Sequence, residues 1–216
     1  MSSAYGKIPK PVNAGSLNEL LPLRKTLRNG EEATLQAVDP TNPNLVKHLH
    51  SLFNGELERG STYPQEEPLD AKQFEDYFLA YDAFVLVKGG PIEADKEYDF
   101  EDKVLGMYYV KPNYPGRCSH ICNGGFFTSP MHRGYGAGVA MAETFLITAP
   151  ALGYKASVFN LVFANNEASI RIWERLGFSR VGCIPQAARL KNSPDQLVDA
   201  YIYHMDFSKL KKTAAA

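Results

Sequence analysis

The feature that most constrains the fold is a strand, a glycine-rich turn, a helix and a second strand that follow one another directly along the chain. The strand segments CNGGFFTS (122–129) and ASVFNLVF (156–163) are apolar and aromatic, as buried strands are. The stretch HRGYGAGVAMAE between them predicts a helix over 136–149 that begins in its glycines. Two strands joined through a helix can lie parallel in one sheet. The sequence therefore predicts a β-α-β unit here.

The segments on either side of this unit predict further strands and helices. Strands are predicted over 33–38, 83–89, 104–112, 180–190 and 198–207. Helices are predicted over 42–60, 70–81 and 166–178, where apolar residues recur at helical spacing. The polar, acidic residues 90–103 predict a hairpin loop. This order predicts a mixed α/β (α+β) fold, with a mostly antiparallel sheet of about seven strands and helices on both faces.

Length and charge limit the classes of function. The 216 residues are predicted to form one domain over 31–208, between a partly flexible N-terminal tail, 1–30, and a C-terminal tail, 209–216. The 23 basic and 24 acidic residues give a net charge of −1, which argues against binding to nucleic acid through bulk charge. The sequence has no apolar run of the roughly 18 residues that a membrane-spanning helix needs.

The cysteines and the N-terminus bear on the compartment. Three cysteines, an odd number, fit a reducing compartment better than a disulfide-bonded fold, so we expect a cytoplasmic protein. The first 18 residues carry two lysines and no acidic residue, which leaves mitochondrial targeting as an alternative. Cys118, His120 and Cys122 alternate and would share one strand face. Ligands so close on a strand suit a tetrahedral metal poorly, so no metal site is expected.

The glycine-rich turn predicts an anion site, because a helix start with an uncovered backbone offers free N–H groups and a favourable dipole. A Walker loop is excluded because G-K-[ST] is absent. The dinucleotide fingerprint would need a glycine where Val139 stands. The pattern R-x-x-G-x-G is met by Arg133, Gly136 and Gly138, and it is typical of the coenzyme A pyrophosphate loop of acetyltransferases. The alternative is a helix start whose small residues only pack against the sheet. His132, just before the loop, is expected to be solvated.

A second motif follows the next strand. It reads N-x-x-S-x-x-x-W-x-x-L-G-F and runs from Asn166 to Phe178, where a second cofactor-binding helix would lie. With this motif and the order of the elements, residues 32–207 resemble the GNAT superfamily of acetyl-CoA-dependent N-acetyltransferases. The strings YVKPNYPGRCSHICNGGF (109–126), APALGYKASVFNLVFANNEAS (149–169) and STYPQ (61–65) are similar to fungal N-acetyltransferases that act on proline analogues such as L-azetidine-2-carboxylate. The resemblance implies acetyl-CoA as co-substrate, a small cyclic imino acid as acceptor, and a homodimer.

The resemblance also implies the site residues. The cofactor-binding residues are expected to be Arg133, Gly134, Tyr135, Gly136, Ala137, Gly138, Asn166 and Trp173. Asn123 and Asn160 are expected to bind the acceptor and to take part in catalysis, and Tyr63 is expected to line the acceptor pocket. Each has a structural alternative: Asn123 could satisfy the backbone at a bulge, Asn166 could cap a helix, and Tyr63 could belong to a plain turn.

The sequence departs from the superfamily in its proton-transfer groups. Many of these enzymes have a glutamate base on the strand before the glycine loop, where this chain offers Asn123 and no carboxylate. Many also have a tyrosine that serves the thiol, where this chain has Trp173, whose indole N–H cannot usefully give up a proton. We therefore expect catalysis mainly by positioning and dipoles, with direct transfer and no acetyl-enzyme.

An acceptor that is a small amino acid carries a carboxylate, and this charge must be paired when it leaves water. Neither 121–130 nor 156–163 contains a Lys or Arg, so amides and backbone N–H groups are expected to bind it. We assign Asn160 to gripping the acceptor, and Asn123 to orienting the amine or the thioester oxygen. Two alternatives remain: an N-acetyltransferase for proteins or peptides, which needs an open groove, and a coenzyme A-binding module without activity.

Overall fold

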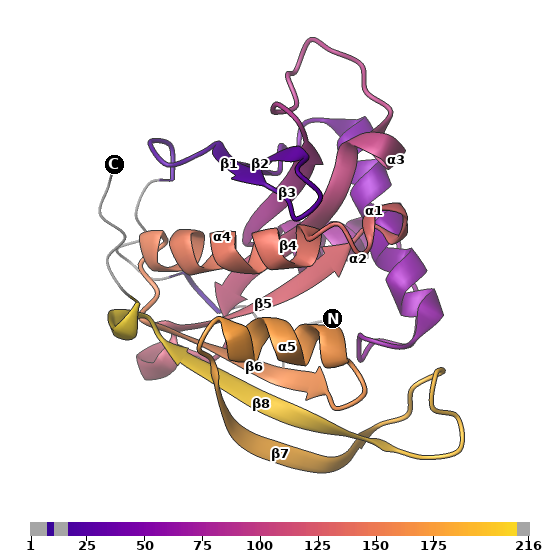
Figure 1. Ribbon diagram of the computed structural model, residues 1–216, viewed down its shortest axis with the longest axis vertical. Coiled ribbons are helices and arrows are strands. Elements are labelled where there is room, and N and C mark those ends of the chain that lie inside the picture. Colours follow the sequence, from indigo (N-terminus) through magenta and orange to yellow (C-terminus); the bar gives the residue numbers. More distant parts are fainter. Residues whose placement is uncertain (1–7, 11–16, 211–216) are drawn as a thin grey trace.

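The computed structural model describes residues 8–10 and 17–210, and it is organised around a single sheet of eight strands (Figure 1). The strands are β1 (Leu23–Thr26), β2 (Glu32–Ala37), β3 (Asp82–Lys88), β4 (Val104–Pro112), β5 (Ile121–Thr128), β6 (Ala156–Phe163), β7 (Ser179–Ala188) and β8 (Val198–Asp206). The α-helices are α1 (Pro43–Arg59), α2 (Ala71–Phe74), α3 (Phe100–Lys103), α4 (Ala137–Ala151) and α5 (Glu167–Arg175).

The sheet is mixed and mostly antiparallel, as predicted. Its strand order is β1-β2-β3-β4-β5-β6-β8-β7. All neighbours are antiparallel except β5 and β6, which are parallel and are joined through α4. The predicted β-α-β unit is therefore confirmed, and it brings the carboxyl ends of β5 and β6 to the same edge of the sheet as the beginnings of α4 and α5 (Figure 1).

Helices cover both faces of the sheet, and each face has its own core. Phe84 and Leu86 of β3 pack with Met141 and Phe145 of α4 on one face. Val85 and the other alternate residues of these strands pack with α1, α2 and the π-helical turn Glu75–Leu79 on the opposite face. Successive strand residues point to opposite faces, which explains why the central strands are apolar at nearly every position. Among the described residues, no helix has both the length and the hydropathy to cross a membrane.

A strand lies within residues 1–30, for which the sequence predicts a partly flexible tail. Strand β1, which the sequence analysis placed in the N-terminal tail, pairs along its length with β2. Leu27 is buried in the core beneath α4, and Ile8 is also buried. The remainder of the predicted tails, 1–7, 11–16 and 211–216, lies outside the described residues.

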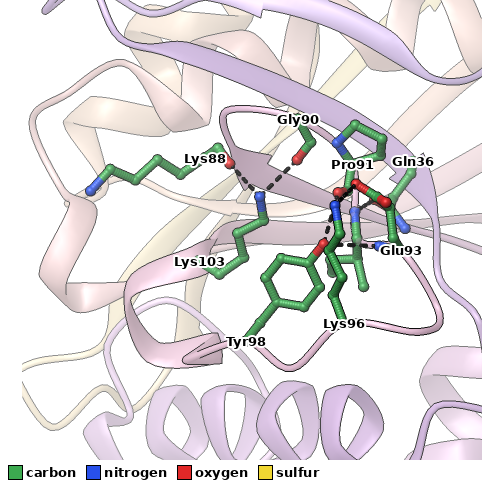
Figure 2. A network of polar contacts seen from close by, with 9 residues as sticks. Gln36, Lys88, Gly90, Pro91, Glu93, Lys96, Tyr98 and Lys103 are labelled. Atoms are coloured by element: carbon green, nitrogen blue, oxygen red, sulfur yellow. Dashed lines mark hydrogen bonds and ion pairs between the residues drawn. The ribbon is translucent and has the colours of Figure 1, made fainter.

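The predicted loop 90–103 is held by a network of polar contacts (Figure 2). The ammonium of Lys103 donates to the carbonyl oxygens of Lys88 at 2.7 Å and Gly90 at 2.8 Å, and it lies 5.1 Å from the ring centroid of Tyr98. Burial lowers the pKa of Lys103, while the charges of Glu93 and Asp102 oppose that shift. The segment ends in the short helix α3, which the sequence analysis did not predict.

Candidate functional site

The candidate site lies where β5 and β6 separate, a place that we call the fork. The two strands pair only at Ile121 with Ala156 and at Cys122 with Ser157. Beyond these pairs they diverge, and β6 has an irregular register against β8 between Phe159 and Val162 (Figure 1). Such a split leaves backbone and side-chain groups of both strands available to a ligand.

The glycine loop, residues 133–138, connects β5 to α4 on one side of the fork. Gly134 has φ +86° and Gly136 has φ +98°, a left-handed backbone that glycine adopts without strain. Helix α4 then begins at Ala137 with no side-chain cap and no acidic residue in its first turn. Its first internal acceptor is Gly136 O, which takes the N–H of Ala140 at 3.0 Å. The N–H groups of residues 137–139 therefore have no helical acceptor, and they can bind an anion.

Packing within the protein does not require a glycine at position 138. A Cβ on Gly138 would lie 3.5 Å from Ile172 Cδ1 of α5 and 3.5 Å from Thr128 Oγ1 at the end of β5, which are ordinary contacts. A Cβ on Gly136 would approach the Arg28 backbone nitrogen to 3.1 Å, so that glycine has a packing reason as well. The uncovered backbone at Gly138 borders the space between α4, α5 and the fork, and it fits a cradle for phosphate groups.

The other residues of the loop differ in their exposure. Tyr135 is 43% exposed, whereas the methyl group of Ala137 is buried, so Ala137 can offer only its backbone to a ligand. His132 is buried, with Nε2 3.3 Å from the carbonyl oxygen of Glu101, so the prediction of a solvated histidine is wrong. It packs beneath the loop because the 3₁₀ turn Pro130–His132 directs it inward.

Arg133 is held by a carboxylate that the sequence analysis did not identify. Its guanidinium donates to Glu56 Oε2 of α1 at 3.0 Å, and its side chain is half exposed. Glu56 is buried and also accepts hydrogen bonds from Arg59 and from the Thr62 hydroxyl. Glu56 therefore connects the glycine loop to the connection between α1 and α2. The signal for it was a charged residue on the apolar face of α1, about three turns of helix after Leu45.

Three asparagine amides meet at the fork, and we call them the amide trio: Asn113, Asn123 and Asn160. Asn113 and Asn160 exchange two hydrogen bonds of 3.0 Å and 2.6 Å, and Asn123 Nδ2 donates to Asn113 Oδ1 at 3.1 Å. Asn123 Oδ1 accepts from the Gly124 N–H at 2.7 Å, which is the backbone role considered as its alternative. The structure thus brings Asn123 and Asn160 together, through an asparagine that sequence reasoning missed.

The amide trio faces the side of the sheet covered by α1 and α2. Cys122 and Phe159 pack beneath α4, so their neighbours Asn123 and Asn160 point to the other face. All three amides are partly buried. Each NH₂ group has two hydrogens, and the trio uses one on each among the described residues, so one N–H per amide is left for a ligand.

Three phenol groups meet on the same face, and we call them the tyrosine trio: Tyr63, Tyr77 and Tyr109. Tyr63 Oη lies 2.6 Å from Tyr77 Oη and 2.8 Å from Tyr109 Oη. Burial raises the pKa of Tyr63 well above its usual value, with a further contribution from Tyr109 and Tyr77, and burial likewise raises the pKa of Tyr109. Tyr63 and Tyr109 therefore stay protonated near neutral pH. Tyr63 lies in a built hydrogen-bond cluster, so a plain turn does not account for it.

Lys111 of β4 completes this face. It is the register partner of Asn123 across β4 and β5, so the two side chains point the same way. Its ammonium lies 4.4 Å from the ring centroid of Tyr77 and 4.8 Å from that of Tyr109. This cation was not predicted, because Lys111 lies outside the segments 121–130 and 156–163 that were expected to form the site.

The two predicted cofactor residues of α5 have structural roles. Asn166 caps the helix, since its side chain accepts from the Ser169 N–H at 3.2 Å. Trp173 is 5% exposed, and its ring centroid lies 4.3 Å from that of Phe159 and 5.0 Å from that of Phe126. Both residues lie on the helix that packs beside α4. Their contact with a cofactor stays a prediction.

A cavity of ≈ 470 Å³ lies next to the tyrosine trio. It is bordered by residues of the connection after α1, including Tyr63, by Leu161 and Phe163 of β6, and by residues 187–191. The two loops that flank it are tied together: the Lys191 N–H donates to Gly60 O at 2.9 Å, and Lys191 Nζ donates to Glu58 O at 2.8 Å. The volume is that of a small-molecule pocket.

The cysteines do not form the arrangement expected of them. Cys118 lies in the 3₁₀ turn Gly116–Cys118, before β5 begins at Ile121, so it does not share a strand face with Cys122. Cys118 and Cys183 are exposed, Cys122 is buried, and all three are free. Burial raises the pKa of the Cys122 thiol, which disfavours a thiolate nucleophile. Within residues 8–10 and 17–210, no group of three or more His, Cys, Asp or Glu side chains could hold a metal.

Comparison with known proteins agrees with this geometry. The profile of the acetyltransferase (GNAT) family matches residues 47–178. The N-acetyltransferase aca1 of Schizosaccharomyces pombe is 46% identical, over 77% of this chain and 82% of its own length. Protein SPT10 of Saccharomyces cerevisiae is 28% identical over 91% of this chain, which spans only 37% of that longer protein.

Solved structures with the same fold include two from bacteria. A GCN5-related N-acetyltransferase from Kribbella flavida has a TM-score of 0.68 at 22% identity, over 81% of this chain and 97% of its own. A GNAT superfamily phosphinothricin acetyltransferase from Sinorhizobium meliloti, solved in complex with AcCoA, has a TM-score of 0.65 at 16% identity, over 81% of this chain and 88% of its own. At these identities the likeness concerns the fold.

Proposed function

The chain belongs to the acetyltransferase (GNAT) family, and on this premise we propose that its acceptor is a small cyclic imino acid such as azetidine-2-carboxylate or a related proline analogue. It is an N-acetyltransferase that uses acetyl-CoA as co-substrate. The observation that carries the acceptor proposal is the tie between Lys191 and the backbone of Glu58 and Gly60. These hydrogen bonds hold the two loops beside the fork together. The space between them is then a small cavity, whereas a peptide acceptor would need an open groove.

The glycine loop is the proposed site for the pyrophosphate of acetyl-CoA. The free N–H groups at the start of α4 and the charge of Arg133 suit an anion, and the missing Cβ of Gly138 leaves room for it. Gly134 and Gly136 shape the turn, and Tyr135 and Ala137 contribute backbone N–H groups. We place Asn166 and Trp173 of α5 along the same cofactor, Asn166 through the amide N–H that its capping bond leaves free.

The amide trio is the proposed site of the acceptor and the reacting groups. Bound acetyl-CoA supplies a thioester whose carbonyl carbon the amine attacks; the C–N bond forms and the C–S bond breaks. Asn160 grips the acceptor, and Asn123 orients the amine or donates to the thioester oxygen as charge develops on it. Tyr63 lines the acceptor side through the tyrosine trio and the cavity beside it.

The proposed transfer is direct and relies on positioning. Strands β4, β5 and β6 carry no Asp, Glu or His, so no carboxylate base projects from the strands of the fork. The proton of the amine therefore passes to water, and the coenzyme A thiolate takes a proton from water. The raised pKa values of Tyr63 and Tyr109 keep these phenols as hydrogen-bond donors, so they do not serve as bases near neutral pH.

A panel of acceptors tests this proposal. Release of the coenzyme A thiol is measured at fixed acetyl-CoA with azetidine-2-carboxylate, proline, the hydroxyproline isomers and a lysine-containing peptide. We expect the highest kcat/KM for one of the cyclic imino acids. A higher kcat/KM for the peptide would replace the proposal with peptide acetylation, and no thiol release with any amine would contradict an active enzyme.

We further propose a cytoplasmic homodimer that does not act on nucleic acid. The strand β7 ends the sheet, and it carries Val181, 59% exposed, and Ile184, 39% exposed. An unpaired edge with apolar side chains favours association with a second copy. Light scattering on the purified protein should give the mass of a dimer, and Val181→Glu should shift it to a monomer. A fluorescent fusion tests the compartment, with mitochondrial signal as the contrary result.

A further inference from the structure

Lys111 carries a positive charge that the fold leaves without a carboxylate. Its ammonium stacks over the rings of Tyr77 and Tyr109, and no Asp or Glu among the described residues forms an ion pair with it. The side chain is partly buried, so its ammonium has lost part of its hydration. Contact with aromatic rings compensates for this only in part. A partly dehydrated ammonium of this kind is ready to receive an anion.

The groups around Lys111 are also suited to bind an anion. Asn123 is its register partner, and Asn113, just beyond the end of β4, is hydrogen-bonded to Asn123. The amide trio offers one unused N–H on each side chain. On the other side of Lys111, burial raises the pKa values of Tyr63 and Tyr109, so these two phenols stay protonated. The groups around this point are therefore donors and a cation, a combination that suits a carboxylate.

We propose that Lys111 binds the carboxylate of the acceptor amino acid and so determines the selectivity for acceptors that carry one; this inference rests on the proposed function. In an imino acid the carboxylate is attached to the carbon that carries the reacting nitrogen. Binding the carboxylate between Lys111 and the amide trio therefore places that nitrogen next to Asn123, at the fork. The strands β5 and β6 contain no Lys or Arg. The cation of the site comes instead from the neighbouring strand β4, where Lys111 lies opposite Asn123.

The test removes the positive charge of Lys111 from the enzyme and, separately, the negative charge of the carboxylate from the acceptor. Wild type, Lys111→Met and Lys111→Arg are compared with azetidine-2-carboxylate and with azetidine-2-carboxamide, which lacks the negative charge. Lys111→Met keeps the length of the side chain and removes its charge. The matched control is Lys47→Met, because Lys47 is an exposed residue of α1 that lies away from the fork and forms no ion pair within the part of the chain that the structure describes. The KM for acetyl-CoA and the melting temperature are recorded for each protein.

We expect Lys111→Met to lower kcat/KM for the carboxylate about 10- to 150-fold, mainly through KM, the range of one charge-assisted hydrogen bond. Its activity on the carboxamide and its KM for acetyl-CoA should stay near those of wild type, and Lys111→Arg should recover part of the loss. A merely structural role would lower activity on both acceptors alike.

Three outcomes decide the matter. If wild type acetylates the carboxylate and Lys111→Met keeps its KM, the inference about Lys111 is wrong and the proposed function stands. Equal use of the carboxylate and the carboxamide by wild type overturns the inference without any variant. If wild type acetylates neither acceptor, the proposed function fails, and the role of Lys111 fails with it.

Discussion

Replacing Gly138 with alanine is expected to raise the stability of the protein while weakening the binding of acetyl-CoA. Gly138 is the second residue of α4 and has no positive φ. The new Cβ would meet Ile172 and Thr128 at 3.5 Å, without a clash. Alanine in a helix is favoured over glycine by about 0.5–1 kcal/mol. For a chain of this size, that gain raises the melting temperature by roughly 1–4 °C.

The effect on the cofactor has the opposite sign. The Cβ would occupy part of the space between Thr128, Ile172 and the first turn of α4, which the phosphate groups are proposed to enter. Displacing one phosphate oxygen from an N–H group removes a charge-assisted hydrogen bond, which costs about 1.5–3 kcal/mol. The dissociation constant of coenzyme A and the KM for acetyl-CoA should therefore rise about 10- to 150-fold. Calorimetry with coenzyme A and steady-state kinetics measure the two quantities.

The control is Gly55→Ala. Gly55 is an exposed residue within α1, and a Cβ there would meet nothing within 4 Å, so the stability gain should be similar and the KM unchanged. Gly136 is unsuitable because its φ of +98° and its closeness to Arg28 would strain any replacement. A Gly138→Ala protein with a raised melting temperature and an unchanged KM for acetyl-CoA would refute the assignment of the loop.

The remaining predictions concern the amide trio and the cysteines. Asn160→Ala should lose about 10- to 150-fold in kcat/KM for the acceptor, mostly through KM, because a bond to a charged group is removed. Asn123→Ala should lose mainly kcat, since its bond strengthens in the transition state; near wild-type kcat/KM in either folded variant would contradict the assignments. A variant without cysteines should keep most of its turnover, and ping-pong kinetics in the wild type would show otherwise. Its substitutions are Cys118→Ser, Cys122→Ala and Cys183→Ser.

The sequence predicted those parts of the fold whose pattern is local. The strands 104–112 and 156–163 agree with β4 and β6 to the residue, because each is a continuous apolar run bounded by turn residues. Strand β1 was missed because LRKT has little strand character of its own, and its pairing with β2 is a tertiary effect. The predicted helix 70–81 is α2 followed by a π-helical turn, a change in hydrogen bonding that apolar spacing does not reveal.

The site was predicted where its residues lie on the two strands of the β-α-β unit, and it was missed where they come from elsewhere. Asn123 and Asn160 stood out as amides in apolar strands, and such amides need partners. Their partner Asn113 lies just beyond β4, and Glu56 lies on α1, so neither can be placed at the fork without knowing the fold.

The place of Lys111 at the fork follows from the pairing of two predicted strands. The segments 104–112 and 122–129 were both predicted as strands, and an antiparallel pairing with Pro112 opposite Cys122 sets Lys111 opposite Asn123. Side chains opposite one another share a face, so a lysine on one strand serves a site on its neighbour. A charged group for a site between two strands can therefore come from the strand next to them. At this fork, that strand supplies the only cation held over the tyrosine trio within residues 8–10 and 17–210.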